Sequence, residues 1–273
     1  LQKKWSKGRI YFHPKKNLTF IQKIILKIPK VRAIIQILIG NDFEHFNRVN
    51  NIKKFLKIHD NYKTIICLSG GDGFSPHFAS IRNKNYNSQI IGVIHDPYPK
   101  SLYPKEYKAS TKNKDFVRKI KFQNVFNTLN TIVFPSKKLY EWFRKDYKID
   151  DSKVKIIPHA VNFNLEEKEL IVKTKKKQVS IVHTGTLLKP RDPSIFLDCI
   201  LQNNSKKLTV EFYGPIDKHI SEKVLKYNNS NNIFINKERI KYEEALTQLV
   251  NADFSLLIES DSNDNPFLPT KFV

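Results

Sequence analysis

Short apolar runs alternate with longer amphipathic segments along all 273 residues. In the first half, β-branched runs predict strands at 64–68, 89–94, 131–134 and 154–157. Helical periodicity there predicts helices at 42–58, 115–129 and 137–145. In the second half, the same patterns predict strands at 179–183, 209–213, 233–235 and 254–258, and helices at 194–202, 218–227 and 242–250. The strands of the first half are so apolar that we expect them to be buried on both faces of a parallel sheet.

This alternation predicts an α/β protein with two doubly wound, Rossmann-like domains that face a cleft. The polar, charge-rich segment 162–178 separates the two halves, so we expect domains at residues 1–162 and 163–273. The chain contains no methionine and stops at Val273, and we therefore expect it to be truncated at both ends.

Composition narrows the class of protein. A content of 40% hydrophobic and 27% charged residues excludes disordered and fibrous classes. Cys67 and Cys199 are too few and too far apart for a disulfide framework, which favours a reducing, cytoplasmic compartment. No apolar run reaches the roughly 18 residues of a spanning helix.

The positive charge is concentrated in the first half of the chain. The whole chain carries +22, with 48 Lys and Arg against 26 Asp and Glu, and residues 1–160 alone carry +21. Residues 1–32 hold ten basic side chains and no acidic one. Such a surface attracts phosphates, either of nucleic acid or of anionic lipid headgroups.

Two segments at the ends of predicted strands have the chemistry of an anion site. The first, H-T-G-T-L-L-K-P-R-D-P-S from His183, offers a glycine for close backbone approach, a hydroxyl and two cations. From this segment alone, an ordinary turn with solvated cations is an equally good interpretation. The second runs from Glu259 to Lys271 and contains Pro269, which suits a first helical turn whose N–H groups face an anion. An ordinary Asn/Asp/Pro loop is the alternative, and the position after a strand favours binding.

Five short motifs occur along the chain in an order and spacing that together are more specific than any one of them. They are V-F-P-S ending at Ser136, I-I-P-H-A-V-N at 156–162, G-T-L-L-K-P-R-D-P, Y-G-P at 213–215, and A-D-F-S-L-L-I-E-S followed by N-P-F-L-P-T-K-F-V. With them the chain resembles glycosyltransferases of the GT-B fold, and most closely family four (glycosyl transferases group 1). The resemblance covers most of the sequence. It departs from the family at Thr186, where the family has arginine, and at Pro266, where the first of two paired glutamates would fall.

The resemblance implies a hexosyltransferase-type enzyme that moves a sugar from a nucleotide-sugar donor to an acceptor hydroxyl in surface glycan or polysaccharide biosynthesis. It implies a retaining reaction without metal or other cofactor, with the acceptor in the first domain and the donor in the second. The donor-binding residues expected are Gly185, Thr186, Lys189, Arg191, Glu259, Asn265, Pro269, Thr270 and Lys271.

A histidine after the second predicted strand is the catalytic candidate. His95 and Asp96 stand in V-I-H-D-P-Y-P, and His95 resembles the family histidine near the transferred sugar. A neutral imidazole there could accept a hydrogen bond from a sugar hydroxyl. A lone loop histidine is more often structural, and it is the resemblance that favours function.

A glycine-rich loop raises an alternative. L-S-G-G-D-G-F resembles the G-G-D-G-T loop of lipid and NAD kinases, with Phe74 in place of threonine. We assign Gly70, Gly71, Asp72 and Gly73 to the acceptor side and keep a lipid or NAD kinase as the alternative. A non-enzymatic, basic nucleic-acid-binding protein would also account for the charge, although no binding motif supports it. The His and Cys residues show no metal-ligand spacing.

One further pattern lies near the start of the chain. Phe20, Ile21, Ile24, Ile25 and Ile28 have helical spacing, with Lys23, Lys27, Lys30 and Arg32 among and after them. This predicts either a helix on an anionic membrane surface or a core helix that buries the same isoleucines. The basic excess favours the membrane, with a glycan or lipid-linked acceptor and a peripheral location on the inner face of the plasma membrane.

Overall fold

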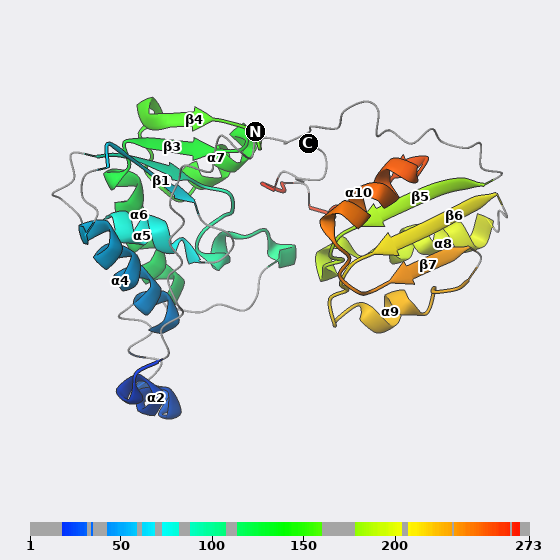
Figure 1. Ribbon diagram of the computed structural model, residues 1–273, viewed down its shortest axis with the longest axis horizontal. Coiled ribbons are helices and arrows are strands. Elements are labelled where there is room, and N and C mark those ends of the chain that lie inside the picture. Colours follow the sequence, from blue (N-terminus) through cyan, green and yellow to red (C-terminus); the bar gives the residue numbers. More distant parts are fainter. Residues whose placement is uncertain are drawn as a thin grey trace. The chain divides into compact units, whose positions relative to one another are not determined.

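The chain forms two compact units in a computed structural model (Figure 1), which describes residues 18–31, 34, 43–58, 62–68, 73–81, 88–107, 114–159, 178–203, 207–230, 232–262 and 264–267. Unit 1 comprises Leu1–Tyr103, Lys108–Pro158 and Pro266–Leu268, and unit 2 comprises Pro104–Tyr107, His159–Asn265 and Pro269–Val273. Each unit therefore includes a short segment from the far part of the chain, which the alternation of strands and helices does not predict. The predicted boundary at residue 162 lies outside the described residues.

Unit 1 is built on a parallel sheet with the strand order β1-β2-β3-β4. Its strands are β1 (Thr64–Leu68), β2 (Gln89–Val93), β3 (Thr131–Phe134) and β4 (Val154–Ile156). Its α-helices are α2 (Phe20–Lys27), α4 (Phe43–Ile58), α5 (Ser75–Ser80), α6 (Lys114–Thr128) and α7 (Lys137–Arg144), and η2 (Lys100–Leu102) and η4 (Asp151–Lys153) are short 3₁₀ turns. The predicted strands and longer helices are confirmed to within a few residues, whereas α5, which carries proline in its first turn, was not predicted.

The prediction that every strand is buried on both faces is wrong for the edges of this sheet. On β1, Cys67 is buried, whereas Ile66 and Leu68 on the opposite face are each 60% exposed. On β4, Lys155 and Ile156 are exposed as well. Of the two central strands, β3 is buried or half-buried throughout, and β2 exposes only Gln89 at its start. Apolar character alone does not distinguish a central strand from an edge strand whose second face is left uncovered.

Aromatic side chains dominate the core of unit 1. Phe74 precedes α5 in the left-handed conformation (φ 43°) and is 1% exposed. Its ring meets Phe122 and Tyr98 edge-on, with centroids 4.9 and 5.2 Å apart. The residue that replaces threonine in the kinase-like loop is therefore a core anchor that holds the end of this loop against α6.

Unit 2 contains a second parallel sheet, with the order β7-β6-β5-β8. Its strands are β5 (Val179–Thr184), β6 (Leu208–Tyr213), β7 (Ile233–Asn236) and β8 (Phe254–Ser255). Its helices are α8 (Ser194–Asn203), α9 (Ser221–Leu225) and α10 (Tyr242–Asn251), with 3₁₀ turns η3 (Lys105–Tyr107) and η6 (Lys189–Arg191). The helix predicted at 218–227 is thus shorter, and so is the strand predicted at 254–258. Two parallel sheets with intervening helices confirm the predicted fold class.

The amphipathic segment near the start of the chain is a helix, as its pattern predicts, but it is not a core helix. Thr19 and Gln22 form a reciprocal capping box at the start of α2. No residue of α2 is buried. The interpretation that its isoleucines pack into the core is therefore wrong.

Candidate donor site in unit 2

Two loops at the carboxyl end of the unit 2 sheet are joined to each other by backbone hydrogen bonds. Gly185, which follows β5, donates its N–H to the carbonyl of Tyr213 at 2.7 Å, and Leu187 donates to that of Pro215 at 2.9 Å. Gly214 has a φ of 134°, and a Cβ atom on it would lie 2.6 Å from the carbonyl oxygen of Gly185. Glycine is needed here because two backbones touch. The G-T and Y-G-P motifs are therefore two halves of one loop pair.

Arg191 is the centre of a polar cluster at this end of the sheet. It ends η6, and its Nε donates to the hydroxyl of Tyr107 at 3.1 Å. Its Nη2 lies 3.4 Å from each carboxylate oxygen of Glu259, and the two side chains are 24% and 30% exposed. Among the described residues no partner is found for Nη1. The guanidinium group is thus oriented from two sides and keeps donors for a ligand.

Glu259 is held from its other side as well. Asn265 donates its side-chain amide to Oε2 of Glu259 at 3.0 Å and approaches the hydroxyl of Ser260 at 3.4 Å. The second oxygen, Oε1, is buried and accepts no hydrogen bond within the described part of the chain, so its interaction there is the ion pair with Arg191. Both carboxylate oxygens of Glu259 are therefore held in place, one by Asn265 and one by the ion pair with Arg191.

The other polar residues of the loop around Arg191 are either exposed or occupied in capping a helix. Thr186 and Lys189 are exposed to solvent on the loop that leads to Arg191. Asp192 accepts from the N–H of Ser194 at 2.9 Å and pairs with Lys223 at 2.8 Å, which fixes the start of α8. In the sequence K-P-R-D-P-S, the D-P-S part is therefore a helix cap, and the cations that remain for a ligand are Lys189 and Arg191.

Tyr107 was missed at the sequence level. It lies 84 positions before Arg191 and belongs to the short segment Pro104–Tyr107 that joins unit 2. Its ring also lies against the guanidinium group, 5.8 Å from Cζ to the ring centroid. Tyr107 belongs to unit 2, but the chain on both sides of its short segment belongs to unit 1, and no local pattern assigns it to this cluster. Pro269, Thr270 and Lys271, the remaining predicted donor residues, lie outside the described residues.

The catalytic candidates lie in unit 1. His95 and Asp96 follow β2 and are both half-buried. His77, another residue that the sequence analysis missed, lies beneath the same strand end, where its Nε2 donates to the carbonyl of Val93 at 3.1 Å. Burial lowers the pKa of His77 to about 4, with a smaller contribution from the neighbouring His95. A neutral His77 therefore supports the start of the loop that carries the candidates.

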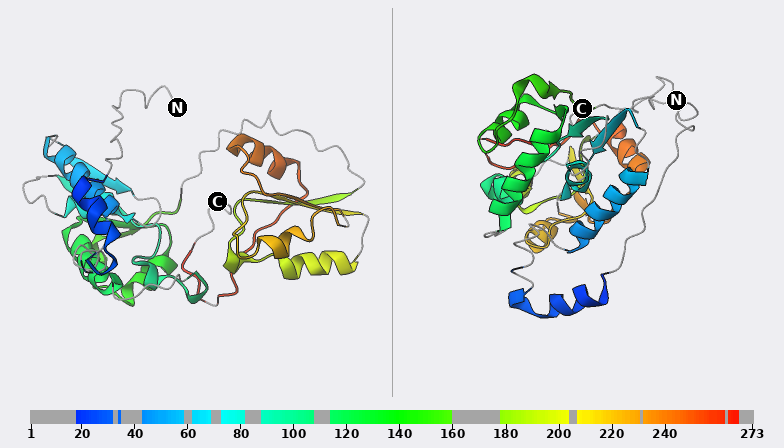
Figure 2. Two further views of the ribbon diagram at one scale, coloured as in Figure 1. Left: turned by 90° about the horizontal axis from the view of Figure 1, so that it is seen from below. Right: turned by 90° about the vertical axis from the view of Figure 1, so that its left-hand side faces the viewer.

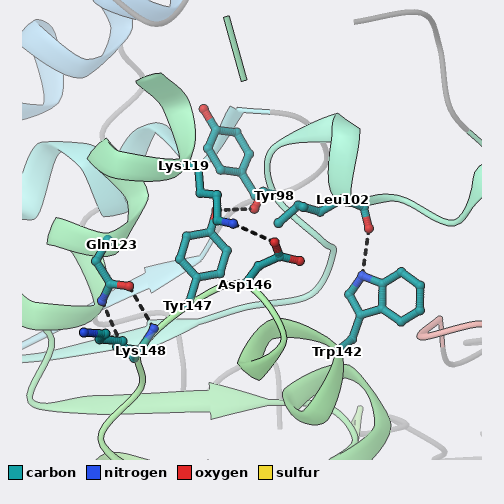
Figure 3. Close-up of polar contacts among 8 residues, drawn as sticks. All are labelled: Tyr98, Leu102, Lys119, Gln123, Trp142, Asp146, Tyr147 and Lys148. Carbon is teal, nitrogen blue, oxygen red and sulfur yellow. Dashed lines mark hydrogen bonds and ion pairs between the residues drawn. The ribbon is translucent and has the colours of Figure 1, made fainter. Parts of the chain in front are cut away.

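The rest of that loop is pinned to α7 and to the segment that follows α7 (Figure 3). The hydroxyl of Tyr147 donates to the carbonyl of Tyr98 at 2.5 Å, and the indole of Trp142 donates to that of Leu102 at 2.7 Å. The ion pair of Lys119 with Asp146 and the paired hydrogen bonds of Gln123 with Lys148 join the surrounding elements, as the close-up shows. His95 and Asp96 are thus held on a fixed loop, which a catalytic group requires.

Of the predicted glycine loop, only Gly73 is described, and Gly70, Gly71 and Asp72 lie outside the described residues. Next to Gly73, Ser75 and His45 lie with Oγ and Nδ1 3.1 Å apart. The kinase alternative expects a β-rich domain after such a loop, whereas unit 2 is a parallel sheet with helices. Within the described residues no group of three or more His, Cys, Asp or Glu side chains is placed to hold a metal ion, and neither cysteine forms a disulfide.

Comparisons with known proteins rest on the fold. No protein-family model and no curated protein matches the sequence. The structure is similar to Anabaena HepE in complex with UDP and glucose, with a TM-score of 0.51 and 11% identity over 75% of this chain and 55% of HepE. It is also similar to the pneumococcal O-GlcNAc transferase GtfA in complex with UDP and GlcNAc, with a TM-score of 0.50 and 14% identity over 80% of this chain and 41% of GtfA. The chain thus spans about half the length of these proteins, and the likeness, together with the two parallel sheets, shows that it has the GT-B glycosyltransferase fold.

Proposed function

We propose that this protein transfers a sugar from a UDP-sugar to an acceptor hydroxyl, with the donor on unit 2 and the acceptor on unit 1. The similar structures HepE and GtfA hold UDP with glucose or GlcNAc, and their fold is the one this chain adopts. The observation that carries the proposal is the cluster of Arg191, Tyr107 and Glu259 at the carboxyl end of a parallel sheet. Open α/β sheets bind their ligands at that end.

The chemistry of the cluster fits a departing nucleoside diphosphate. When the bond from the sugar to the diphosphate breaks, negative charge grows on the phosphate oxygens. Arg191 already has its guanidinium oriented by Tyr107 and Glu259, so it can meet this charge without first reorganising. Lys189, exposed two residues earlier, adds the net positive charge that the neutral Arg–Glu pair lacks. Thr270 and Lys271 would contribute further donors, and Pro269 would begin the helical turn that presents them.

Glu259 is a positioning residue in this proposal. Its carboxylate forms the ion pair that orients Arg191. Asn265 donates to Oε2 of Glu259, so the carboxylate cannot rotate freely. A fixed carboxylate keeps the guanidinium group in one orientation, which is what electrostatic stabilisation of a departing diphosphate requires.

The remaining features of the reaction are part of the same proposal. His95 and Asp96 act on unit 1, where a neutral imidazole accepts a hydrogen bond from a sugar hydroxyl or orients the acceptor. The transfer moves a hexose with retention of configuration, needs no metal, and builds a surface glycan or polysaccharide. Proton NMR of the product would report the anomeric configuration, and undiminished turnover in EDTA would support metal independence.

A ligand screen by thermal unfolding of the full chain tests the proposal. We expect UDP, UDP-glucose and UDP-GlcNAc to raise the melting temperature; a ligand at 100 times its Kd adds about 2.7 kcal/mol of stability. GDP-mannose, ADP-glucose and ATP serve as matched anionic ligands. The kinase alternative would replace the proposal if ATP stabilises the protein, UDP does not, and the protein phosphorylates a lipid or NAD.

A further inference from the structure

Helix α2 exposes an apolar surface that the proposed sugar transfer does not explain. Phe20, Ile21 and Ile24 lie on one side of the helix, Ile28 is its C-cap residue, and the four are 77%, 68%, 43% and 47% exposed. A single exposed isoleucine is ordinary, but four large exposed apolar side chains within nine residues call for an explanation. We call these four residues the outer face of α2.

The opposite side of α2 is attached to the rest of unit 1 through α4. Gln22, Ile25 and Leu26 are half-buried. The side-chain amide of Gln22 exchanges two hydrogen bonds with that of Asn47 on α4, at 3.1 and 3.2 Å. Figures 1 and 2 show α2 beside the end of α4 and away from the sheet. The helix is therefore anchored by one side, and its outer face is the side that remains for a partner.

Positive charge accompanies the outer face. Lys23 and Lys27 lie one turn apart on α2, Lys30 follows it, and all three are exposed. The first acidic residue of the chain is Asp42, so no carboxylate in the first 41 residues offsets these cations. Arg32, the fourth cation predicted to take part, lies outside the described residues.

The size of the helix limits what it can do with a lipid bilayer. Its eight residues span about 12 Å, less than half of a hydrocarbon core of about 30 Å. None of the helices that the structure describes is long and apolar enough to cross a membrane. An apolar side flanked by lysines is instead the arrangement of a helix that lies in the plane of the headgroups.

We infer that the outer face of α2 docks the protein onto an anionic lipid bilayer, with its apolar side chains at the acyl boundary and its lysines among the headgroups. Nucleic acid would pair with the lysines but would leave Phe20 and the isoleucines in water. An acidic protein surface would do the same unless it offered an apolar groove. An anionic bilayer is the partner that satisfies both halves of the pattern at once. The inference does not depend on sugar transfer.

Vesicle co-sedimentation of the full chain tests the lysines. We expect binding to vesicles of phosphatidylcholine mixed with phosphatidylglycerol, little binding to phosphatidylcholine alone, and release as salt rises. The variant K23Q/K27Q/K30Q should bind on the order of 100-fold more weakly, since each lysine near an anionic surface contributes about fivefold. The control K237Q/R239Q/K241Q removes the same charge from exposed positions of unit 2 and should bind as the parent does.

A fluorescence experiment tests insertion of the outer face. Ile21→Trp places an indole on the outer face, and Ile195→Trp places one on α8, where the isoleucine is 80% exposed. We expect anionic vesicles to shift the emission of the first variant to the blue and to leave the second unchanged. Unfolding midpoints equal to that of the parent would show that each variant is folded.

The outcomes decide the inference. It is wrong if the parent ignores anionic vesicles at low salt, if the lysine variant binds as tightly as its control, or if Ile21→Trp shows no shift while bound. If the parent binds RNA through the same lysines and does not bind lipid, the charge would be assigned to nucleic acid. If the parent does not bind lipid but self-associates, and Ile21→Ser abolishes the self-association, the outer face would be assigned to a second copy of the chain.

Discussion

Replacing Arg191 by alanine should weaken UDP binding and also destabilise unit 2. The second effect follows from the structure, because the guanidinium group neutralises Glu259. Exposed ion pairs contribute about 0.2–1 kcal/mol, and breaking a buried pair costs about 3–5 kcal/mol. With side chains 24% and 30% exposed, this pair lies between the two limits, and we expect Arg191→Ala to lower the free energy of unfolding by about 1–2 kcal/mol.

The effect on the ligand should be larger than the effect on stability. Loss of one charge-assisted contact to a phosphate costs about 1.5–3 kcal/mol, which corresponds to roughly 10- to 150-fold in Kd. Glu259→Gln keeps the shape of the side chain and the cation, so it should weaken UDP binding less than Arg191→Ala. In the double variant the uncompensated carboxylate is gone, and part of the lost stability should return.

Two measurements on the parent, the two single variants and the double variant separate the role of Arg191 in binding from its role in stability. Calorimetric titration with UDP gives the affinity, and denaturation by urea gives the free energy of unfolding. Arg239→Ala, which removes an exposed arginine from the same unit, is the control and should change neither quantity appreciably. The reasoning is refuted if Arg191→Ala lowers stability but binds UDP like the parent, since Arg191 would then be only half of a structural ion pair. A stability loss equal to that of Arg239→Ala would show that the pair with Glu259 contributes nothing.

Tyr107→Phe removes only the hydroxyl that orients the guanidinium, and titration should show UDP affinity lowered about two- to twelvefold, or about 0.5–1.5 kcal/mol, with the urea midpoint nearly unchanged. Gly214→Ala should cost on the order of 1–3 kcal/mol in urea denaturation, because the backbone is left-handed and the new Cβ would meet a carbonyl oxygen at 2.6 Å. His77 has its pKa lowered from 6.5 to about 4, so the stability from its neutral form should be complete above pH 6.5 and fall by about 3 kcal/mol as the pH drops to 4. His77→Gln should flatten this slope in denaturation curves measured across that range. Phe74→Ala should destabilise unit 1 by about 3–5 kcal/mol, while Phe116→Ala, at an exposed position, should stay within about 0.5 kcal/mol.

The order of strands and helices was readable from the sequence because it depends on local periodicity. A β-branched run such as β3, or the amphipathic repeat of α7 with Ser136 capping the N–H of Leu139, carries its own signal within a few residues. For the same reason the eight-residue helix α2 was predicted, although its pattern left two environments open. The Gly185 motif was predicted as a place where the backbone approaches an anion, and the structure shows a different neighbour, Gly214, which no local pattern indicated.

The environment of each face was decided only by the tertiary structure, because burial depends on what packs there and not on the residue itself. Ile66 on β1 is as apolar as any residue of β3 but is left uncovered, and Phe74 in a polar glycine-rich loop is buried in the core. The partner of Arg191 is a further example. Tyr107 meets it only because a four-residue segment joins the second unit, and no local pattern encodes a contact across 84 positions. Sequence determined which elements form, since that is local, while long-range packing determined which side chains meet.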